Sequence, residues 1–172
     1  VRGNHETRGA YARNFFRYLA GPEGKFYYAF TYGPIRFIVL DSGEDKPDTD
    51  VEYSGLVDFD NYILEQKEWL ARELESPEFR AASFRVVLSH IPFGKGSWYG
   101  SERLRKQLLP LLESVRIDLM LSGHNHAFGF MDKGKVTAFP IIVNSNNSVL
   151  TMFGSEDLLK VQVKQIDGKV LL

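Results

Sequence analysis

The sequence predicts a single α/β domain with a mixed β-sheet, spanning residues 1–172. Its length is that of one ordinary domain, and its composition, with 44% apolar and 25% charged residues, is typical of a soluble globular chain. In the middle of the chain, short apolar runs alternate with amphipathic helical patterns, which is typical of a parallel β-α-β unit. Runs rich in β-branched and aromatic residues flank this unit and indicate antiparallel strands.

The chain opens with a polar loop, followed by an aromatic-rich segment. Residues 10–19 fit a short helix or an ordered coil. Two β-rich runs follow at 26–32 and 35–40, and the Gly-Pro pair between them is typical of a turn. We therefore expect an antiparallel hairpin. Its second strand ends at Asp41, where an Asp-Ser-Gly sequence favours a turn over a metal ligand.

An acidic stretch connects this hairpin to the first long helix. Residues 44–60 are rich in Asp, Glu, Gly, Pro and Thr, and we expect a solvated surface loop. The helix should span about 61–74, because its apolar residues recur at separations of four and seven and leave the charged residues facing water. Asp58 or Asp60 is expected to cap its N-terminus.

The next segments alternate between strand and helix. The apolar runs 83–89 and 117–121 are short and rich in branched residues, as in strands covered on both faces. Between them, a glycine-rich loop at 94–100 leads to a helix at roughly 102–114, which Pro110 should kink. Because the carboxyl ends of parallel strands meet at one edge of a sheet, we expect a functional site in the loops that follow these two strands.

The remainder of the chain predicts further β-structure. Apolar and polar residues alternate in its last long run, and an Asp-Gly pair after that run signals a hairpin turn. The sequence contains no internal repeat and no low-complexity tract. The expected strands cover 128–131, 136–143, 149–153, 159–164 and 169–172.

Composition excludes several classes of function. The 21 basic and 22 acidic residues nearly cancel, so no positive field is available for a nucleic acid. No apolar run approaches the roughly 18–20 residues that span a bilayer, and we expect no membrane segment. The chain has no cysteine, which excludes disulfides, thiolate metal sites and a cysteine nucleophile.

The four histidines carry the clearest functional signal. His5, His90, His124 and His126 all lie in predicted loops rather than in apolar stripes. One loop histidine is usually a surface residue, but four such positions together indicate a shared hydrolytic metal site, since imidazole suits borderline divalent ions. Two other motifs of hydrolytic enzymes are absent from the sequence. Residue 9 is glycine, which rules out an H-E-x-x-H zinc motif, and no G-x-S-x-G nucleophile elbow is present.

Three blocks of the sequence resemble a known family. G-N-H-E at 3–6, V-L-S-H at 87–90 and G-H-N-H at 123–126 are similar to the last three of the five blocks of the calcineurin-like metallophosphoesterases. The purple acid phosphatase-like branch is the most similar. The blocks contain every histidine of the chain, and the resemblance extends to about residue 145. It implies a β-sandwich of mixed sheets flanked by helices, of which this chain is the C-terminal portion.

The resemblance implies a ligand set for two metal ions. Asn4, His90 and His124 would bind one ion through the amide oxygen and imidazole nitrogens, and His126 would bind the other. In the complete enzyme these ions would be Mn, Zn or Fe, and the sequence does not identify which. The substrate would be a phosphate ester.

The resemblance also implies a mechanism for the parent enzyme. A metal-bound hydroxide would attack the ester in line, as in other two-metal hydrolases. His5 would lie beside the phosphate and stabilise the developing charge or protonate the leaving oxygen. Glu6 would hold the His5 ring through a hydrogen bond.

One departure from the family limits this prediction. The first two family blocks, a D-x-H and a G-D segment, do not occur in the sequence, so the bridging aspartate and two further ligands on the His126 side would be missing. We therefore expect a truncated domain that binds at most one ion weakly and is inactive or weakly active.

The absence of the first two family blocks also indicates which partners the chain would have. The missing N-terminal half of the domain would be one partner, and exposed strand edges favour a homodimer. The alternative is a non-catalytic structural or interaction module that retains the histidine loops. The sequence names no compartment, although the resemblance implies an extracytoplasmic one.

Two aromatic residues and three cations near these loops remain open to two interpretations. Trp98 and Tyr99 would either line the substrate entrance or pack the glycine-rich loop onto the core. Arg2, Lys95 and Arg103 would either attract phosphate or be solvated surface charges.

Overall fold

The structure is a computed structural model that describes residues 1–94 and 98–172, so Lys95 lies outside the described residues. Within these ranges the strands form two sheets. The strands are β1 (Tyr28–Tyr32), β2 (Ile35–Leu40), β3 (Phe84–Ser89), β4 (Leu119–Ser122), β5 (Gly129–Met131), β6 (Ile141–Val143), β7 (Ser148–Gly154) and β8 (Leu159–Gln165).

The larger sheet has six strands in the order β1-β2-β3-β4-β6-β5. Strands β2, β3, β4 and β6 run parallel to one another, whereas β1 and β5 pair antiparallel with β2 and β6 at the two edges. Strands β7 and β8 form a separate antiparallel hairpin. The predicted α/β class with a mixed sheet is therefore confirmed, as are the first hairpin and the parallel pair at the centre.

The helices lie mainly between β2 and β4 in the sequence. They are α1 (Phe16–Leu19), α2 (Phe59–Glu73), α3 (Pro77–Ala81), α4 (Tyr99–Gln107) and α5 (Leu109–Glu113), with short 3-10 turns at His5–Thr7, Ala12–Phe15, Pro22–Gly24 and Val51–Tyr53. The helix expected at 102–114 is interrupted before Pro110, which occupies the first turn of α5. Within residues 10–19, the 3-10 turn at Ala12–Phe15 continues into the single helical turn α1, which agrees with the expected short helix.

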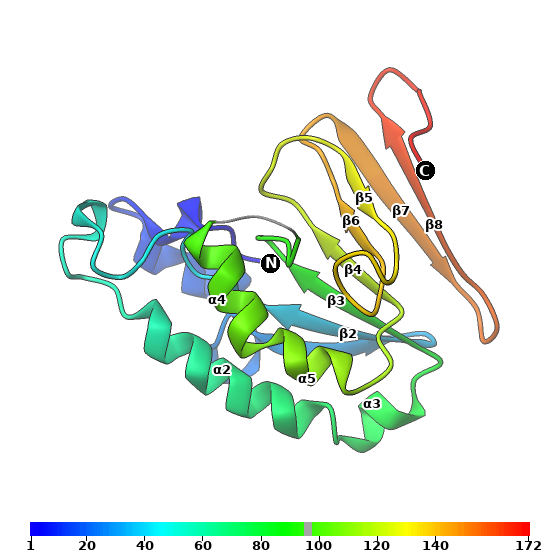
Figure 1. Ribbon diagram of the computed structural model, residues 1–172, viewed down its shortest axis with the longest axis horizontal. Helices are drawn as coiled ribbons and strands as arrows, with labels where there is room; N and C mark the ends of the chain where they lie inside the picture. The colour runs from blue at the N-terminus through cyan, green and yellow to red at the C-terminus, as the bar shows by residue number, and fades with distance from the viewer. Residues whose placement is uncertain (95–97) are drawn as a thin grey trace.

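Two apolar clusters hold the layers together. Successive residues of β3 point to opposite faces of the sheet, so Val87 packs under the helices and Val86 packs under the hairpin. Figure 1 shows α2, α4 and α5 as one layer along the large sheet, with β7 and β8 at its other side. The hairpin is the second sheet of the expected sandwich, and its Val163 is completely buried.

Two predicted strands are shorter than expected. Within 136–143, only the last three residues form β6, because the chain reverses before them and Gly134 N donates to Thr137 O at 2.8 Å. Within 169–172, a single bridge joins Val170 to Lys164. Among the described residues, no helix is long and apolar enough to cross a membrane.

The acidic stretch differs from the solvated loop that we expected. Glu44 is completely buried and Tyr53 nearly so. The stretch is therefore anchored to the core at these two residues, whereas much of the rest lies in solvent as expected, with Val51 89% and Leu56 86% exposed. Asp58 is the N-cap residue of α2 but makes no capping hydrogen bond with its side chain. Instead, Asp48 Oδ2 accepts a hydrogen bond from Asp60 N in the first turn, at 2.8 Å.

Candidate functional site

Three segments far apart in the sequence meet at one edge of the large sheet. His90 follows the last residue of β3, and His124 lies two residues beyond β4. Because these strands are parallel neighbours, both histidines emerge at the same edge, and Gly123 N donates to His90 O at 3.0 Å. The segment before the turn at His5–Thr7 brings Asn4 to this edge, beside His90, and Figure 1 shows the N-terminus near the tip of the β3 arrow.

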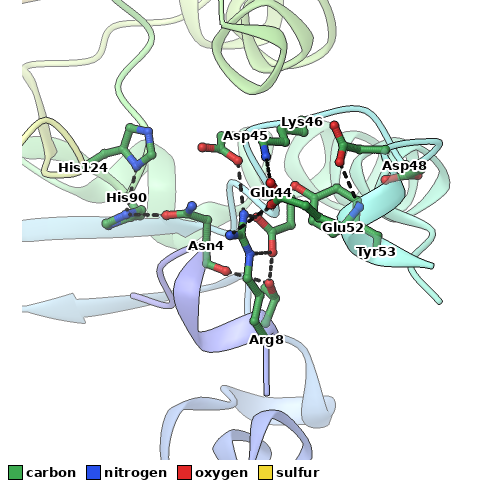
Figure 2. A network of polar contacts seen from close by, with 12 residues as sticks. Asn4, Arg8, Glu44, Asp45, Lys46, Asp48, Glu52, Tyr53, His90 and His124 are labelled. Carbon is green, nitrogen blue, oxygen red and sulfur yellow. Dashed lines mark hydrogen bonds and ion pairs between the residues drawn. The ribbon is translucent and has the colours of Figure 1, made fainter. Parts of the chain in front are cut away.

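Asn4, His90 and His124 form a compact cluster of donor atoms. His90 Nε2 lies 3.1 Å from Asn4 Oδ1 and 3.3 Å from His124 Nδ1. The two imidazole planes are nearly perpendicular, at 83°. Figure 2 shows the three side chains in a row with their polar atoms directed at one another. Asn4 is only 1% exposed, so its amide is held in place by the surrounding protein.

The cluster fits one metal ion. With metal–ligand bonds of about 2.1 Å, adjacent ligand atoms lie roughly 3.0–3.4 Å apart, and the two separations around His90 Nε2 fall in this range. Amide oxygen and imidazole nitrogen suit borderline divalent ions. However, within residues 1–94 and 98–172 no three His, Asp or Glu side chains lie close enough together to hold a metal ion by themselves. The described donors would therefore supply only part of a ligand set.

All four histidines border the same cavity, as the sequence predicted. The cavity has a volume of about 290 Å³ and is lined by Asn4, His5, Glu6, Asp45, His90, His124 and His126. Asp45 is the one lining residue that the sequence did not single out. Its position within a run of acidic residues carries no signal that separates it from its neighbours. The fold alone brings it to the histidines.

The turn that carries the last two histidines has an unusual backbone. His124 and His126 have φ values of 70° and 57°, in the left-handed region that non-glycine residues rarely adopt. A hydrogen bond from Asn125 N to Gly123 O, at 2.8 Å, closes the turn between them. Such strained residues concentrate at functional sites. Here the strain presents two histidine side chains to one cavity from a three-residue segment.

The environment favours neutral imidazoles in the cluster. Burial lowers the pKa of His90 below its ordinary value, and His124 lowers it further, while Glu6 acts in the opposite direction. Burial also lowers the pKa of His124, with Asp45 opposing it. A neutral imidazole keeps a lone pair on one nitrogen, which is the form that binds a metal ion.

The two expected catalytic residues, His5 and Glu6, have different surroundings in the structure. His5 is exposed at the cavity, and no hydrogen bond of its ring is described for residues 1–94 and 98–172. Glu6 Oε2 accepts a hydrogen bond from Gly3 N at 2.7 Å. Within residues 1–94 and 98–172 no hydrogen bond joins Glu6 to the His5 ring, so the role that the resemblance implies for Glu6 stays a prediction.

The two aromatic candidates, Trp98 and Tyr99, also have different surroundings. Trp98 lies against His124, with ring centroids 4.9 Å apart, and is 53% exposed. It thus stands beside the histidine cluster. The Tyr99 hydroxyl instead donates to the Asp60 carboxylate at 3.0 Å, and the Arg103 guanidinium lies over the Tyr99 ring. Tyr99 is therefore anchored at the start of α4 and does not line the cavity.

The cations Arg2 and Arg103 have structural partners. Arg2 forms an ion pair with Asp41, whose other carboxylate oxygen accepts a hydrogen bond from Gly43 N at 3.1 Å. This arrangement confirms Asp41 as a turn residue. Arg103 is buried and donates to Asp60 and to Glu44 O. Neither arginine is a solvated surface charge, and neither lines the histidine cavity.

Comparisons with known proteins agree with this geometry. Residues 1–128 match the family model of the calcineurin-like phosphoesterases. Purple acid phosphatase 23 of Arabidopsis thaliana is 24% identical over 151 residues, which cover 77% of this chain and 29% of that protein. The chain thus spans less than a third of this relative.

A solved structure is similar as well. It is that of purple acid phosphatase PPD1 from seeds of yellow lupin, Lupinus luteus. The superposition has a TM-score of 0.61 at 16% identity and covers 88% of this chain and 32% of the lupin chain. At this level of identity the similarity shows the fold alone, and the fold is that of a metallophosphoesterase.

Proposed function

Because the chain belongs to the calcineurin-like phosphoesterase family, we propose that the protein hydrolyses a phosphate ester with metal ions as cofactors. The observation that supports this most directly is the convergence of Asn4 Oδ1, His90 Nε2 and His124 Nδ1 at separations of 3.1 and 3.3 Å. These donors come from three segments that share no secondary-structure element. Packing of the apolar core does not by itself require these polar atoms to lie close together.

The residues of this chain would supply one side of the site. Asn4, His90 and His124 would hold one ion, and His126 would contribute to a second ion. The remaining ligands, including a bridging aspartate, would come from the two family blocks that the 172 residues do not contain. When bound, such ions acidify water and neutralise charge on the phosphoryl oxygens.

His5 would act on the substrate rather than on a metal. Its imidazole is exposed at the cavity, where it can donate a hydrogen bond to a phosphoryl oxygen or a proton to the leaving oxygen. Trp98 would cover the cluster from the side of His124. Together these residues would orient the ester and limit access of water to the cavity.

Metal binding by the chain itself tests the proposal. We expect isothermal titration with Zn²⁺ or Mn²⁺ to show one weak site per chain. His90→Ala and His124→Ala should abolish it, because each removes a donor from the cluster. Asn125→Ala, in the same turn as His124, is the matched control and should bind as wild type. If no ion binds, or if both histidine variants bind normally, the alternative of a non-catalytic module gains support.

A longer chain that adds the two family blocks tests the proposed activity. We expect such a protein to hydrolyse p-nitrophenyl phosphate when loaded with metal. His124→Ala should abolish turnover without unfolding the protein, as checked by circular dichroism. Wild-type rates in this variant would remove His124 from the mechanism.

A further inference from the structure

Glu6 and His90 approach each other across the bare Cα of Gly3. A methyl group on this Cα would lie 2.5 Å from Glu6 Oε2 and 3.2 and 3.3 Å from Cε1 and Nδ1 of His90. Glu6 is fixed in this position because the same Oε2 accepts the hydrogen bond from Gly3 N. Glu6 Oε2 and His90 Nδ1 both border the position of this methyl group and are therefore less than about 6 Å apart, within the range over which a charge acts on its neighbour.

The two nitrogens of His90 have different surroundings. Nε2 faces the donor cluster, with Asn4 Oδ1 at 3.1 Å and His124 Nδ1 at 3.3 Å. Nδ1 lies on the side of Gly3 and Glu6.

A neutral imidazole carries its single proton on one nitrogen, and the partner of the other nitrogen decides which one. A carboxylate beside Nδ1 stabilises a proton there and leaves a lone pair on Nε2. Carboxylates that act in this way on metal-binding histidines fix both the tautomer and the orientation of the ring.

We propose that Glu6 is a positioning residue for His90, whose carboxylate keeps the imidazole proton on Nδ1 and the Nε2 lone pair directed at Asn4 and His124. Gly3 is part of this arrangement, because a side chain at this position would push the Glu6 carboxylate away from the His90 ring. The role in metal binding rests on the proposed function. The tautomer, by contrast, is a property of the chain without metal.

A competing arrangement exists and makes the proposal testable. Without metal, a proton on His90 Nε2 could donate to Asn4 Oδ1 at 3.1 Å. In that case Nδ1 would carry no proton, and Glu6 would have no positioning role. The two arrangements differ in which nitrogen of His90 is protonated.

NMR of the metal-free chain distinguishes them. At about pH 8, above the ordinary histidine pKa of about 6.5, we expect ¹⁵N shifts that show His90 protonated on Nδ1, with signals assigned by their loss in His90→Ala. Glu6→Gln should move the population toward Nε2, and Glu6→Asp should restore part of the Nδ1 form. Glu52→Gln removes an exposed carboxylate elsewhere and should leave the tautomer unchanged. An Nε2-protonated His90 in the wild type overturns the proposal.

Metal affinity gives a second readout. Glu6→Gln should weaken Zn²⁺ binding by about 10–100-fold, the usual effect of removing such a partner. Gly3→Ala should have a similar effect, because its methyl group displaces the carboxylate. Both variants should remain folded. Unchanged affinity in Glu6→Gln contradicts the inference, whereas a wild-type chain that binds no ion contradicts the proposed function and leaves the tautomer measurement valid.

Discussion

Glu44 holds the loop beside the site in place through several hydrogen bonds. It is completely buried and accepts hydrogen bonds from Arg8 at 2.9 and 2.7 Å, from the Tyr53 hydroxyl at 3.1 Å and from Thr7. Figure 2 shows this network beside the histidine cluster. The Thr7 hydroxyl also donates to Asn4 O at 2.6 Å, so the buried carboxylate is connected to the segment that carries Asn4.

The surroundings of Glu44 set its pKa. Burial alone would raise the pKa, but the hydrogen bonds from Arg8 and Thr7 outweigh burial and hold it below the ordinary value of 4.5. The carboxylate in turn contributes, with burial, to raising the pKa of Tyr53 to about 12. Because the pKa of Glu44 is lower in the folded chain, its charge stabilises the fold above about pH 4.5. This contribution is lost as the pH falls through the folded value.

We predict that Glu44→Gln lowers the free energy of unfolding by about 2–4 kcal/mol at about pH 7, since it removes the charge of a buried carboxylate that is paired with the partly exposed Arg8. The difference from wild type should shrink as the pH falls below about 4.5, where wild-type Glu44 also becomes neutral. Urea unfolding at several pH values measures this. Glu52→Gln, on a carboxylate that is 48% exposed, is the control and should change stability by less than about 0.5 kcal/mol. A difference that is independent of pH would contradict the argument.

At this scale the sequence predicted residues that have distinctive chemistry. Four histidines in loops stand out, and their meeting in one cavity follows from the parallel strands. Glu44 and Asp45 could not be predicted, because the neighbouring sequence contains many acidic residues and only the folded chain buries one of them. Likewise, nothing in the sequence shows that Glu6 turns toward Gly3 and His90.

Between elements, Gln66 joins α2 to the end of β2. Its side chain is completely buried, accepts a hydrogen bond from Asp41 N at 2.7 Å and donates one to Asp41 O at 2.9 Å. Both backbone groups of Asp41 are thereby satisfied at the point where β2 ends and the buried turn toward Glu44 begins. The contact fixes the position of this turn, which leads directly to Asp45 at the cavity.

We predict that Gln66→Leu, a change of similar volume, lowers the free energy of unfolding by about 2–4 kcal/mol, because it leaves two buried backbone groups unpaired. Equilibrium denaturation measures the loss. Gln107→Leu is the matched control, since within the described residues the Gln107 side chain accepts only a long hydrogen bond of 3.4 Å from Lys67 Nζ, and it should cost less than about 0.5 kcal/mol. Equal losses in the two variants would show that the Asp41 hydrogen bonds are not responsible.

Elements with a strong periodic pattern were predicted well. The α2 helix spans Phe59–Glu73 against an expected 61–74, and its period of apolar residues is a local property of the sequence. The short α3 was missed, although Ser76 caps it and Pro77 occupies its first turn, which are recognised helix signals. Residues 136–143 were predicted too long as a strand, because β-propensity does not show where the chain reverses.

At the scale of the whole molecule, the two edges of the hairpin differ. Beyond β8, the C-terminal segment forms backbone hydrogen bonds with Val163, and the exposed Lys160 and Lys164 discourage further pairing. Strand β7 contains no charged residue and, within the described residues, pairs only with β8. On its outer face Val149 is 59% exposed and Phe153 is 61% exposed.

We propose that a second copy of the 172-residue chain pairs with this edge. The apolar residues of β7 are arranged symmetrically about Thr151, so antiparallel pairing centred there would place Val149 of one copy opposite Phe153 of the other. Aromatic and β-branched residues in such cross-strand positions stabilise a sheet. On each side, β7 would lie between the lysines of β8 and the new contact, so these lysines would not oppose it.

A pair of lysine substitutions tests this edge. Thr151→Lys places a charge at the centre of the proposed contact and should shift the chain toward the monomer in sedimentation velocity over a range of concentrations. Gln162→Lys is the matched control, because Gln162 is exposed and lies directly opposite Thr151 in the hairpin register. It adds the same charge to the same face, one strand away from the free edge, and should leave association unchanged. A wild-type chain that stays monomeric at every concentration, or equal effects of both lysines, would exclude pairing through β7.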